Sequence, residues 1–387
     1  MDSSSQRRVY MDNAATSWPK LPSVLEAVQD YLANCGATSG RGAYRSAIIA
    51  ENWVGRARQA VAKLIGASAE EIAFCSNGTH ALNQALYGLL KPGDEVITCE
   101  LEHNSVLRPL VALRDKQGVT LKIAPSEANG VAAPGSIHSL ISEQTSAVVV
   151  GQASNVTGWA TDIAALEIPE STHFIVDASQ TLGYLPIDVR ATNISVLAAA
   201  AHKGLGAIGG TGLIYVRKDL HSGFRPLLRG GTGRKSNSIE ATPEWPEMVE
   251  VGNLNIPGII SVAVAAEHLL EDPEYQDQWR PAFRQLFQGL SQMPEVQIVG
   301  AGEAENLAKH LPVVSLQIEG WDAHDLAAIL DSSFGIEVRA GWHCAALAHR
   351  AVGTEADGGT LRLSPGRYTT AAEVTYVLES LKSILTV

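Results

Sequence analysis

The sequence has 387 residues, 45% of them hydrophobic and 18% charged, and its formal net charge is −12 at pH 7. A chain of this length exceeds what one hydrophobic core usually organises, so two domains, or one large domain with a satellite, are expected. Because the balance is acidic and both signs are interspersed, the composition disfavours a surface for nucleic acid or anionic membrane. It favours a soluble protein that handles small molecules.

No segment predicts export or membrane insertion. The first eight residues are polar, and no apolar secretory core follows them. The most apolar stretch, 256–266, is interrupted by Pro257 and Gly258, and no apolar run approaches the roughly 20 residues of a membrane helix. We therefore expect a cytoplasmic protein with neither a membrane nor a nucleic-acid partner.

The cysteines predict free thiols and no metal site. Cys35, Cys75, Cys99 and Cys344 are widely spaced, and none stands in a CxxC or Cys/His pair typical of zinc sites. A reduced compartment fits this pattern. Cys75 and Cys99 lie in apolar, strand-like runs and are interpreted as small core residues. Cys344 does not lie in such a run.

Helical and strand patterns alternate from residue 55 to residue 216. The segment 55–64 places Ala57, Val61 and Leu64 on one helix face, and a second helix is expected at 81–90. The expected strands are 72–75, 95–98, 120–123, 147–150, 173–176, 195–198 and 213–216. Strands alternating with helices predict a mostly parallel sheet covered on both faces. Sites in such sheets lie beyond the carboxyl ends of the strands, so the residues directly after each strand are the candidates.

The pattern of residue types along the chain changes after about residue 225. A polar, glycine-rich stretch at 229–237 precedes an apolar helix that begins near Pro257 and reaches about Leu270. Beyond it we expect strands at 313–318 and 337–339 and helices at 323–330 and 371–384. The prediction is an α/β protein with a large domain of residues 18–256 and a small domain of residues 1–17 and 257–387.

Two charged residues follow expected strands. Lys203 comes after the strand at 195–198, flanked by small residues and without a partner nearby in sequence, so it could meet a ligand beyond the strand end or be a solvated surface lysine. Asp177 directly follows the apolar strand at 173–176. A carboxylate there is costly unless it meets a cation, such as the protonated pyridine nitrogen of a cofactor. A helix N-cap is the alternative.

Two further strand ends carry polar motifs. Asn77-Gly78-Thr79-His80 opens the helix at 81–90, where Gly then Thr presents free N–H groups, a hydroxyl and the positive end of the helix dipole to a phosphate. Simple N-capping would leave the same pattern. His103, in Glu102-His103-Asn104-Ser105, follows the strand at 95–98. It could stack on an aromatic ring or be a solvated loop histidine.

In their order along the chain, these motifs resemble those of class V aminotransferases. Specifically, the chain resembles cysteine desulfurases and selenocysteine lyases with an Arg-x-Gly-x-His-Cys-Ala segment, from about residue 9 to 385. The matching segments are Met11-Asp12-Asn13-Ala14-Ala15-Thr16-Ser17, Asn77-Gly78-Thr79-His80-Ala81-Leu82-Asn83, Gly93-Asp94-Glu95-Val96, Glu102-His103-Asn104-Ser105, Val176-Asp177-Ala178-Ser179-Gln180 and His202-Lys203-Gly204. The resemblance implies fold type I of the enzymes that use pyridoxal 5′-phosphate (PLP), normally a homodimer with active sites at the interface.

The resemblance also implies roles for individual residues. Lys203 would form the Schiff base with PLP, Asp177 would pair with the pyridinium nitrogen, and His103 would stack on the ring; Lys203, His103 and Cys344 form the expected catalytic set. The other implied cofactor contacts are Asn155, Gln180, Gly78, Thr79, His80 and His202, with Gly231 and Thr232 reaching the phosphate from the partner subunit.

The segment Val338-Arg339-Ala340-Gly341-Trp342-His343-Cys344-Ala345 decides the predicted reaction. Its small residues indicate an exposed loop in which a thiol could move, and Arg339 and His343 could lower the pKa of Cys344. An incidental small residue is the alternative. In the resembling family this cysteine attacks the sulfur of a cysteine–PLP adduct, which leaves a persulfide and releases alanine.

Arg362 is the candidate for binding the substrate carboxylate. In Thr360-Leu361-Arg362-Leu363-Ser364, strand alternation places it opposite Leu361 and Leu363. An arginine so held suits bidentate capture of an amino-acid carboxylate, although a solvated strand face would show the same alternation. The resemblance agrees with the first interpretation and adds Arg339 and Asn155 as substrate contacts.

The predicted function is thus that of a PLP-dependent cysteine desulfurase with L-cysteine as substrate and a sulfur-acceptor protein as partner. Three departures from the family pattern stand against it. Ala200 replaces the usual Ser or Thr, which removes one phosphate hydrogen bond, Thr369 replaces Asn, and Pro365-Gly366-Arg367 is unusual. A selenocysteine lyase, C–S lyase, epimerase or aminotransferase on this scaffold stays open, as does a weakly catalytic sulfur-relay or regulatory partner.

Overall fold

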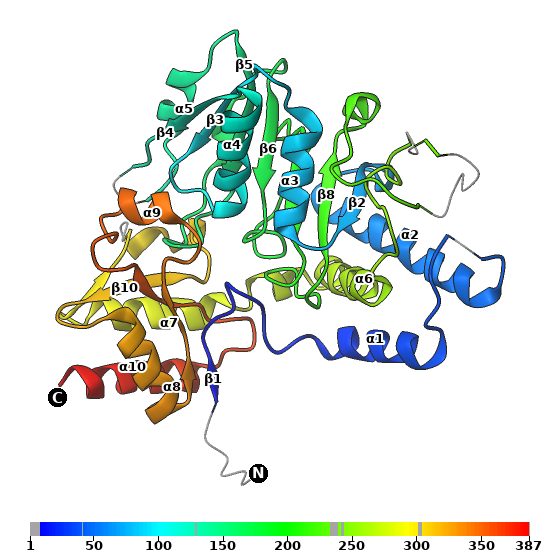
Figure 1. The fold of residues 1–387 in the computed structure, drawn as a ribbon. Coiled ribbons are helices and arrows are strands. Elements are labelled where there is room, and N and C mark those ends of the chain that lie inside the picture. Colours follow the sequence, from blue (N-terminus) through cyan, green and yellow to red (C-terminus); the bar gives the residue numbers. More distant parts are fainter. Residues whose placement is uncertain are drawn as a thin grey trace.

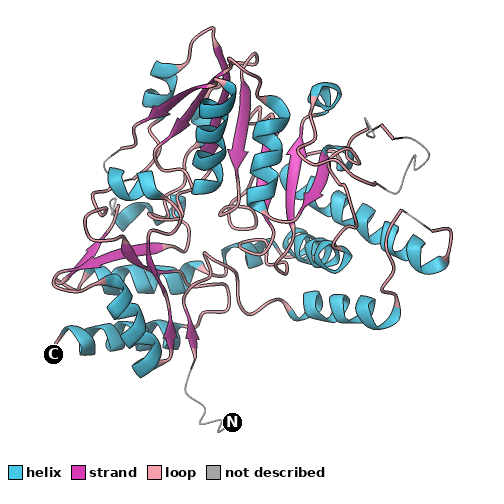
Figure 2. Cartoon of the chain, viewed as in Figure 1, coloured by secondary structure: helices cyan, strands magenta, loops and turns pink. Residues whose placement is uncertain are grey.

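A seven-stranded sheet with helices on both faces forms the larger part of the molecule (Figures 1 and 2). The computed structural model describes residues 8–40, 42–127, 130–232, 239–240, 244–300 and 304–386. The rest of the glycine-rich stretch, 233–237, lies outside the described residues. In the described part of the chain, no helix is long and apolar enough to cross a membrane.

The strand order is β2-β8-β7-β6-β5-β3-β4. In this order the strands are Ile72–Cys75, Gly212–Val216, Val196–Ala200, His173–Asp177, Thr145–Gly151, Glu95–Cys99 and Thr120–Ala124. Strand β8 pairs antiparallel with both β2 and β7, and the other pairs are parallel. The predicted mostly parallel sheet is confirmed, and every strand except β8 points the same way.

The central strands are buried on both faces, which explains their continuous apolar runs. In β7, Leu197 and Ala199 join the hydrophobic core on one face, while Val196 and Ala198 join the core on the other. Helices α3 (Gly78–Leu89) and α4 (Asn104–Gln117) cover the second face. The helices α1 (Pro22–Asn34), α2 (Arg45–Ile65), α5 (Pro134–Leu140) and α6 (Ile256–Glu271) contribute to the first core.

A smaller unit packs below the strand ends (Figure 1). Its antiparallel sheet has the order β12-β13-β10-β9, and β1 pairs with β11 in parallel. These strands are Arg339–Gly341, Thr360–Leu363, Val314–Ile318, Val296–Ile298, Val9–Tyr10 and Ile336–Glu337. The helices of this unit are α7 (Arg280–Ser291), α8 (Ala323–Phe334), α9 (Ala346–Ala351) and α10 (Ala371–Leu385).

The packing of the N-terminal strand and of helix α6 indicates where the two units meet. Residues Val9 and Met11 are buried with the small sheet, in keeping with the expected assignment of 1–17 to the small domain. Helix α6 instead packs along α1 and α2 in the core of the large sheet. We therefore propose that the small domain resumes after Glu271 rather than at residue 257.

The unusual Pro365-Gly366-Arg367 segment joins the two units. The buried guanidinium of Arg367 donates to the carbonyl oxygens of Gly204 (2.7 Å), Tyr275 (2.9 Å) and Gly183. Its carbon lies 4.7 Å and 4.6 Å from the ring centroids of Tyr184 and Tyr275. No carboxylate of the described residues pairs with it, so carbonyl oxygens and aromatic faces stabilise this cation.

Removing this guanidinium should destabilise the fold. We expect Arg367→Met to lower the free energy of unfolding by about 3 kcal/mol or more, because it leaves buried carbonyl oxygens without donors. Arg350→Met is the matched control, since Arg350 pairs with Glu355 in solvent at 2.9 Å and should cost about 1 kcal/mol or less. Denaturant titration measures both, and equal losses would contradict the role given to Arg367.

Candidate active site

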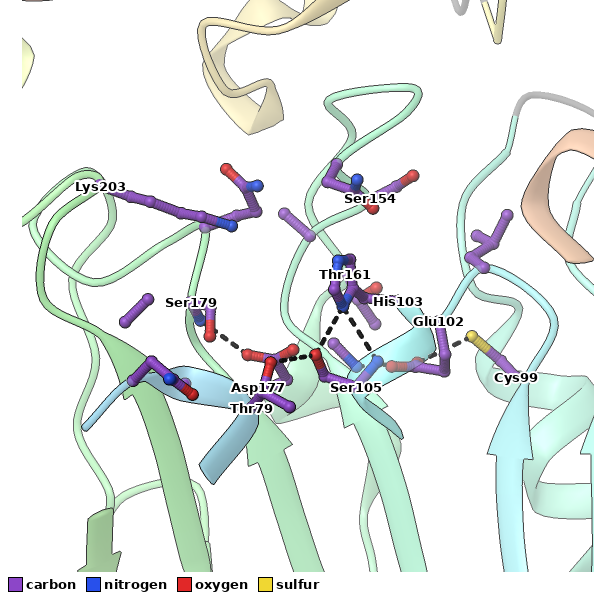
Figure 3. A pocket seen from close by; sticks show the side chains of 18 of the residues that line it. Thr79, Cys99, Glu102, His103, Ser105, Ser154, Thr161, Asp177, Ser179 and Lys203 are labelled. Atoms are coloured by element: carbon purple, nitrogen blue, oxygen red, sulfur yellow. Dashed lines mark hydrogen bonds between the residues drawn. The ribbon is translucent and has the colours of Figure 1, made fainter. Parts of the chain in front are cut away.

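A cavity opens where the parallel strands end. The loops that follow β2, β3, β5, β6 and β7 line it, because these strands share one direction. Lys203, Asp177 and His103 enter it from three different strand ends (Figure 3). Three residues predicted from separate parts of the sequence therefore face one space.

Lys203 extends into the cavity from the loop after β7 (Figure 3). Burial is the main cause that lowers the pKa of its amine to about 8; the charge of Asp177 opposes this shift, and the charges of Arg362 and Arg339 add to it. Roughly a tenth of the amine is therefore neutral at pH 7 and about half at pH 8, and this neutral form is the nucleophile that can capture a carbonyl group.

Asp177, the last residue of β6, accepts the N–H of Ser179 at 2.8 Å on Oδ1. Both residues line the cavity (Figure 3). The β6 strand pairs with β5 so that Asp177 lies beside Gly151, whose small size leaves room above the strand ends. Asp177 therefore presents a carboxyl group to a cationic ligand at the floor of the cavity.

His103 caps helix α4 and is part of a hydrogen-bond chain. Its Nδ1 accepts the Ser105 N–H at 3.0 Å and lies 2.9 Å from Ser105 Oγ, which is 2.7 Å from Thr79 Oγ1. Because Nδ1 accepts the N–H, the ring proton of the neutral form sits on Nε2. Burial, and next the charge of Lys203, lower the pKa of His103 to about 4, so the ring is neutral and suited to stacking.

Glu102 is a cavity residue whose role the sequence did not indicate. It is buried, and its Oε1 accepts from the Gly151 N–H at 2.8 Å and from Cys99 Sγ at 3.2 Å. Burial raises the pKa of Glu102 to about 8, and the charge of Asp177 adds to the effect. Glu102 is therefore largely protonated at neutral pH and adds little charge near Asp177. Its partner Cys99 is buried, as predicted, and also lines the cavity.

The start of α3 faces the cavity. Asn77 caps the helix by accepting the His80 N–H at 2.8 Å, while the N–H groups of Gly78 and Thr79 have no acceptor in the described part of the chain. A side chain at Gly78 would collide with Ser179, because its Cβ would lie 2.6 Å from Ser179 Oγ. This arrangement suits an anion such as a phosphate.

Two histidines predicted near this phosphate end differ in placement. His202 lines the cavity, and its Nδ1 has no partner among the described residues. Burial, then the charge of Lys203, lower the pKa of His202 to about 4. The His80 ring turns back to Ser76, whose Oγ is 3.1 Å from Nδ1, and is not among the residues that line the cavity.

Gly231 and Thr232 lie away from the cavity of their own chain. The Gly252 N–H donates to the Gly231 carbonyl at 2.7 Å, and Thr232 lines a different groove together with Thr38 and Gly40. Any contact between Gly231-Thr232 and a cofactor would therefore involve the cavity of another subunit.

Cys344 stands in a backbone segment with unusual dihedral angles. Its φ is +59° and that of His343 is +46°; residues other than glycine rarely adopt this backbone conformation. The Cys344 carbonyl accepts the Asn104 N–H at 2.7 Å, and the His343 carbonyl accepts from Asn155 Nδ2 at 2.7 Å. Both hydrogen bonds come from loops at the large-sheet strand ends, so the large unit holds the strained segment in place.

The thiol of Cys344 is exposed and lines a groove next to His103 and Arg108. His343, expected to lower the pKa of this thiol, points the other way. Its buried ring bonds Thr360 Oγ1 at 2.9 Å, and burial lowers the pKa of His343 to about 2, so the ring carries no positive charge. His343 therefore does not supply the positive charge that was expected beside Cys344.

Two arginines face each other across β12 and β13. Arg339 is directly opposite Arg362, and like charges in that register repel unless an anion lies between them. Arg362 is buried; it donates to Asp12 Oδ1 at 2.8 Å and to the Asn155 carbonyl at 3.1 Å. Its Nε has no partner among the described residues. A carboxylate ligand would satisfy both features.

Asn155 and Gln180 line the cavity as expected, but their amides are engaged. Asn155 Nδ2 holds the His343 carbonyl, and Gln180 Nε2 donates to the Ala14 carbonyl at 3.2 Å. Asp12 and Ser105 also belong to the site, although their residue types and positions in the sequence did not predict it. Asp12 pairs with Arg362, which is distant in sequence, and Ser105 pairs with His103 in a loop. Only the motifs quoted for the family resemblance could have identified them.

The comparisons agree with this geometry. A model of the family described as Aminotransferase class-V matches residues 9–377. The chain belongs to this family. A relative from Methanothermobacter thermautotrophicus, named "Probable cysteine desulfurase", is 33% identical over 97% of this chain and 94% of its own. "Cysteine desulfurase IscS" from Methanosarcina thermophila is 30% identical over 99% of this chain and 93% of its own.

Solved structures of the class-V family confirm the predicted fold. The apo structure of a cysteine desulfurase from Thermococcus onnurineus NA1 matches with a TM-score of 0.89 and 30% identity, over 98% of this chain and 95% of the other. The cysteine desulfurase CsdA from Escherichia coli, in its S-sulfonic acid form, matches with a TM-score of 0.86 and 26% identity, over 98% and 95%. The fold is type I of the PLP-dependent enzymes, with a large, mostly parallel sheet domain and a smaller α/β domain.

The lowered pKa of Lys203 predicts selective reactivity in this class-V protein. Because the neutral amine is the nucleophile, a pKa of about 8 should let a small aldehyde, trapped with a mild hydride reagent, label Lys203 with a midpoint near pH 8. Mass spectrometry would compare Lys203 with the exposed Lys63. Labelling of Lys203 that rises only above about pH 10, as for an ordinary lysine, would contradict the environment described.

Proposed function

We propose that this chain is a PLP-dependent cysteine desulfurase that moves sulfur from L-cysteine to Cys344 and releases L-alanine. The observation that carries the proposal is the placement of the Cys344 segment. An exposed thiol, on a strained segment bound to the loops of the cavity, stands next to His103 and the Lys203 site. The relatives named above carry the same activity in their names.

The residues present fit PLP. The free N–H groups of Gly78 and Thr79, together with His202 Nδ1, suit its phosphate; Asp177 suits its pyridinium nitrogen; and the neutral His103 suits its ring. Lys203 would hold it covalently. When bound there, PLP would act as an electron sink for charge that develops at the substrate Cα.

The protein's own groups would divide the remaining work. Arg362, through its unpartnered Nε, and Arg339 would hold the substrate carboxylate. The Lys203 amine, once displaced by the substrate amine, would take the Cα proton, and its lowered pKa matches that task near neutral pH.

Sulfur transfer would then fall to Cys344. Its thiolate would attack the substrate sulfur, so that a new S–S bond forms while the C–S bond breaks. The electron pair of the C–S bond stays with the substrate carbon, which takes up a proton to give alanine. The persulfide remains on Cys344, at the exposed position from which an acceptor can collect it.

The first test is product analysis with L-cysteine and a thiol reductant. The PLP-loaded protein should release sulfide and alanine in equal amounts. Cys344→Ala should keep the cofactor absorbance but lose at least about 100-fold in sulfide release, because the nucleophile is gone. Cys35→Ala, which removes a thiol outside the cavity, is the control and should retain the activity.

Other products would assign a different chemistry. Pyruvate and ammonia in place of alanine would identify β-elimination by a C–S lyase. Amounts of product that stay the same in Cys344→Ala would contradict the role of that residue. A variant of Lys203, Lys203→Ala, that kept full turnover would refute the covalent attachment of PLP.

We further propose that the chain works as a cytoplasmic homodimer that passes sulfur to an acceptor protein. Apolar side chains that a partner could cover lie on α1 and α2, where Leu25 is 51%, Leu32 60% and Ile48 52% exposed. The position of Gly231 and Thr232 away from their own cavity supports this proposal, since the cavity of a second subunit could use them.

The homodimer proposal predicts the effect of charging this face. Leu25→Glu together with Leu32→Glu should yield a monomer in sedimentation velocity and weaken PLP binding, because the loop of the partner is lost. Ile123→Glu is the control: Ile123 is 41% exposed on the edge strand β4, far from α1 in Figure 1, and should leave the dimer intact. A double variant that stays dimeric would contradict the proposed interface.

A further inference from the structure

We propose that Ser179 supplies a hydroxyl ligand to the phosphate of PLP, beside the position where Ala200 offers none. This inference rests on the proposed binding of PLP. Ala200 ends β7 and lines the cavity, but its methyl group cannot donate a hydrogen bond. A hydroxyl at this end of the cavity must therefore come from another residue.

The Ser179 hydroxyl and the Ala200 methyl group both border the start of α3. A Cβ built on Gly78 would lie 2.6 Å from Ser179 Oγ and 3.3 Å from Ala200 Cβ. Gly78 is the first residue of α3, so Ser179 Oγ stands beside the free N–H groups at that helix start. Figure 3 shows Ser179 in the cavity wall between Lys203 and Asp177.

The backbone holds Ser179 in this place. Its N–H donates to Asp177 Oδ1 at 2.8 Å, and the Ala178 N–H donates to the Ala198 carbonyl of β7 at 2.8 Å. The side chain itself makes no hydrogen bond with the described residues, so its proton is available to a ligand. Because the anchoring bonds come from the backbone, a change of the side chain should leave the loop unaltered.

The other hydroxyl at the helix start is already committed. His103 Nδ1 accepts the Ser105 N–H and therefore carries no proton, and Ser105 Oγ lies 2.9 Å from it. Ser105 Oγ also lies 2.7 Å from Thr79 Oγ1, so the two hydroxyls hydrogen-bond to each other. The Thr79 hydroxyl thus already has a partner, whereas the Ser179 hydroxyl has none among the described residues.

The test compares PLP with pyridoxal, which lacks the phosphate. Apo-protein is titrated with each, and the dissociation constant is read from cofactor absorbance. Ser179→Ala should weaken PLP binding about 10-fold, the loss of one hydrogen bond to a charged acceptor, and leave pyridoxal binding unchanged. Ala200→Ser in the Ser179→Ala background should restore most of the PLP affinity, because the new hydroxyl would stand beside the same helix start.

Each outcome separates this inference from the proposed function. Unchanged PLP affinity in Ser179→Ala, or equal weakening of PLP and pyridoxal, would overturn the role of Ser179 while PLP binding by the parent protein still stood. A parent protein that binds neither compound would overturn the PLP proposal itself. Failure of Ala200→Ser to rescue would also count against Ser179, since it would show that a hydroxyl at this point does not reach the phosphate.

Discussion

Burial of the Lys203 amine beside a single carboxyl group is the constraint on which the site depends. Desolvation and the charges of Arg362 and Arg339 favour the neutral amine, and the charge of Asp177 limits the effect. The neighbouring groups fit this balance: burial keeps His103 neutral and Glu102 largely protonated, so they add little charge beside the lysine. The neutral fraction of this amine, in a cavity with one acidic and one cationic end, can capture a carbonyl compound that carries an anion.

The two units of the fold divide the chemistry between them. The strand ends of the large sheet hold Lys203 and the start of α3, while the small unit contributes Arg362 and Cys344. Arg367 connects these parts, because it belongs to the segment after the Arg362 strand and donates to the carbonyl of Gly204. A buried cation thus links the strand of Arg362 to the loop of Lys203.

Much of the fold followed from local patterns. The apolar runs from 72 to 216 predicted the strands within a few residues, since a strand buried on both faces needs continuous small and β-branched side chains. The rule that sites lie beyond parallel strand ends then led to Lys203, Asp177 and His103. The sequence also indicated that helix α6 is buried, but an apolar helix pattern does not show against which sheet the helix packs.

The sequence by itself determined which chemical groups exist and on which strand ends they lie, because hydrophobic periodicity and turn residues act over short distances along the chain. Only the tertiary structure decided how those groups are used. It turned the His343 ring toward Thr360, paired the Thr79 hydroxyl with that of Ser105 and left the Ser179 hydroxyl without a partner among the described residues. Hydrogen-bond direction and desolvation depend on partners brought together by folding, and no local pattern records them.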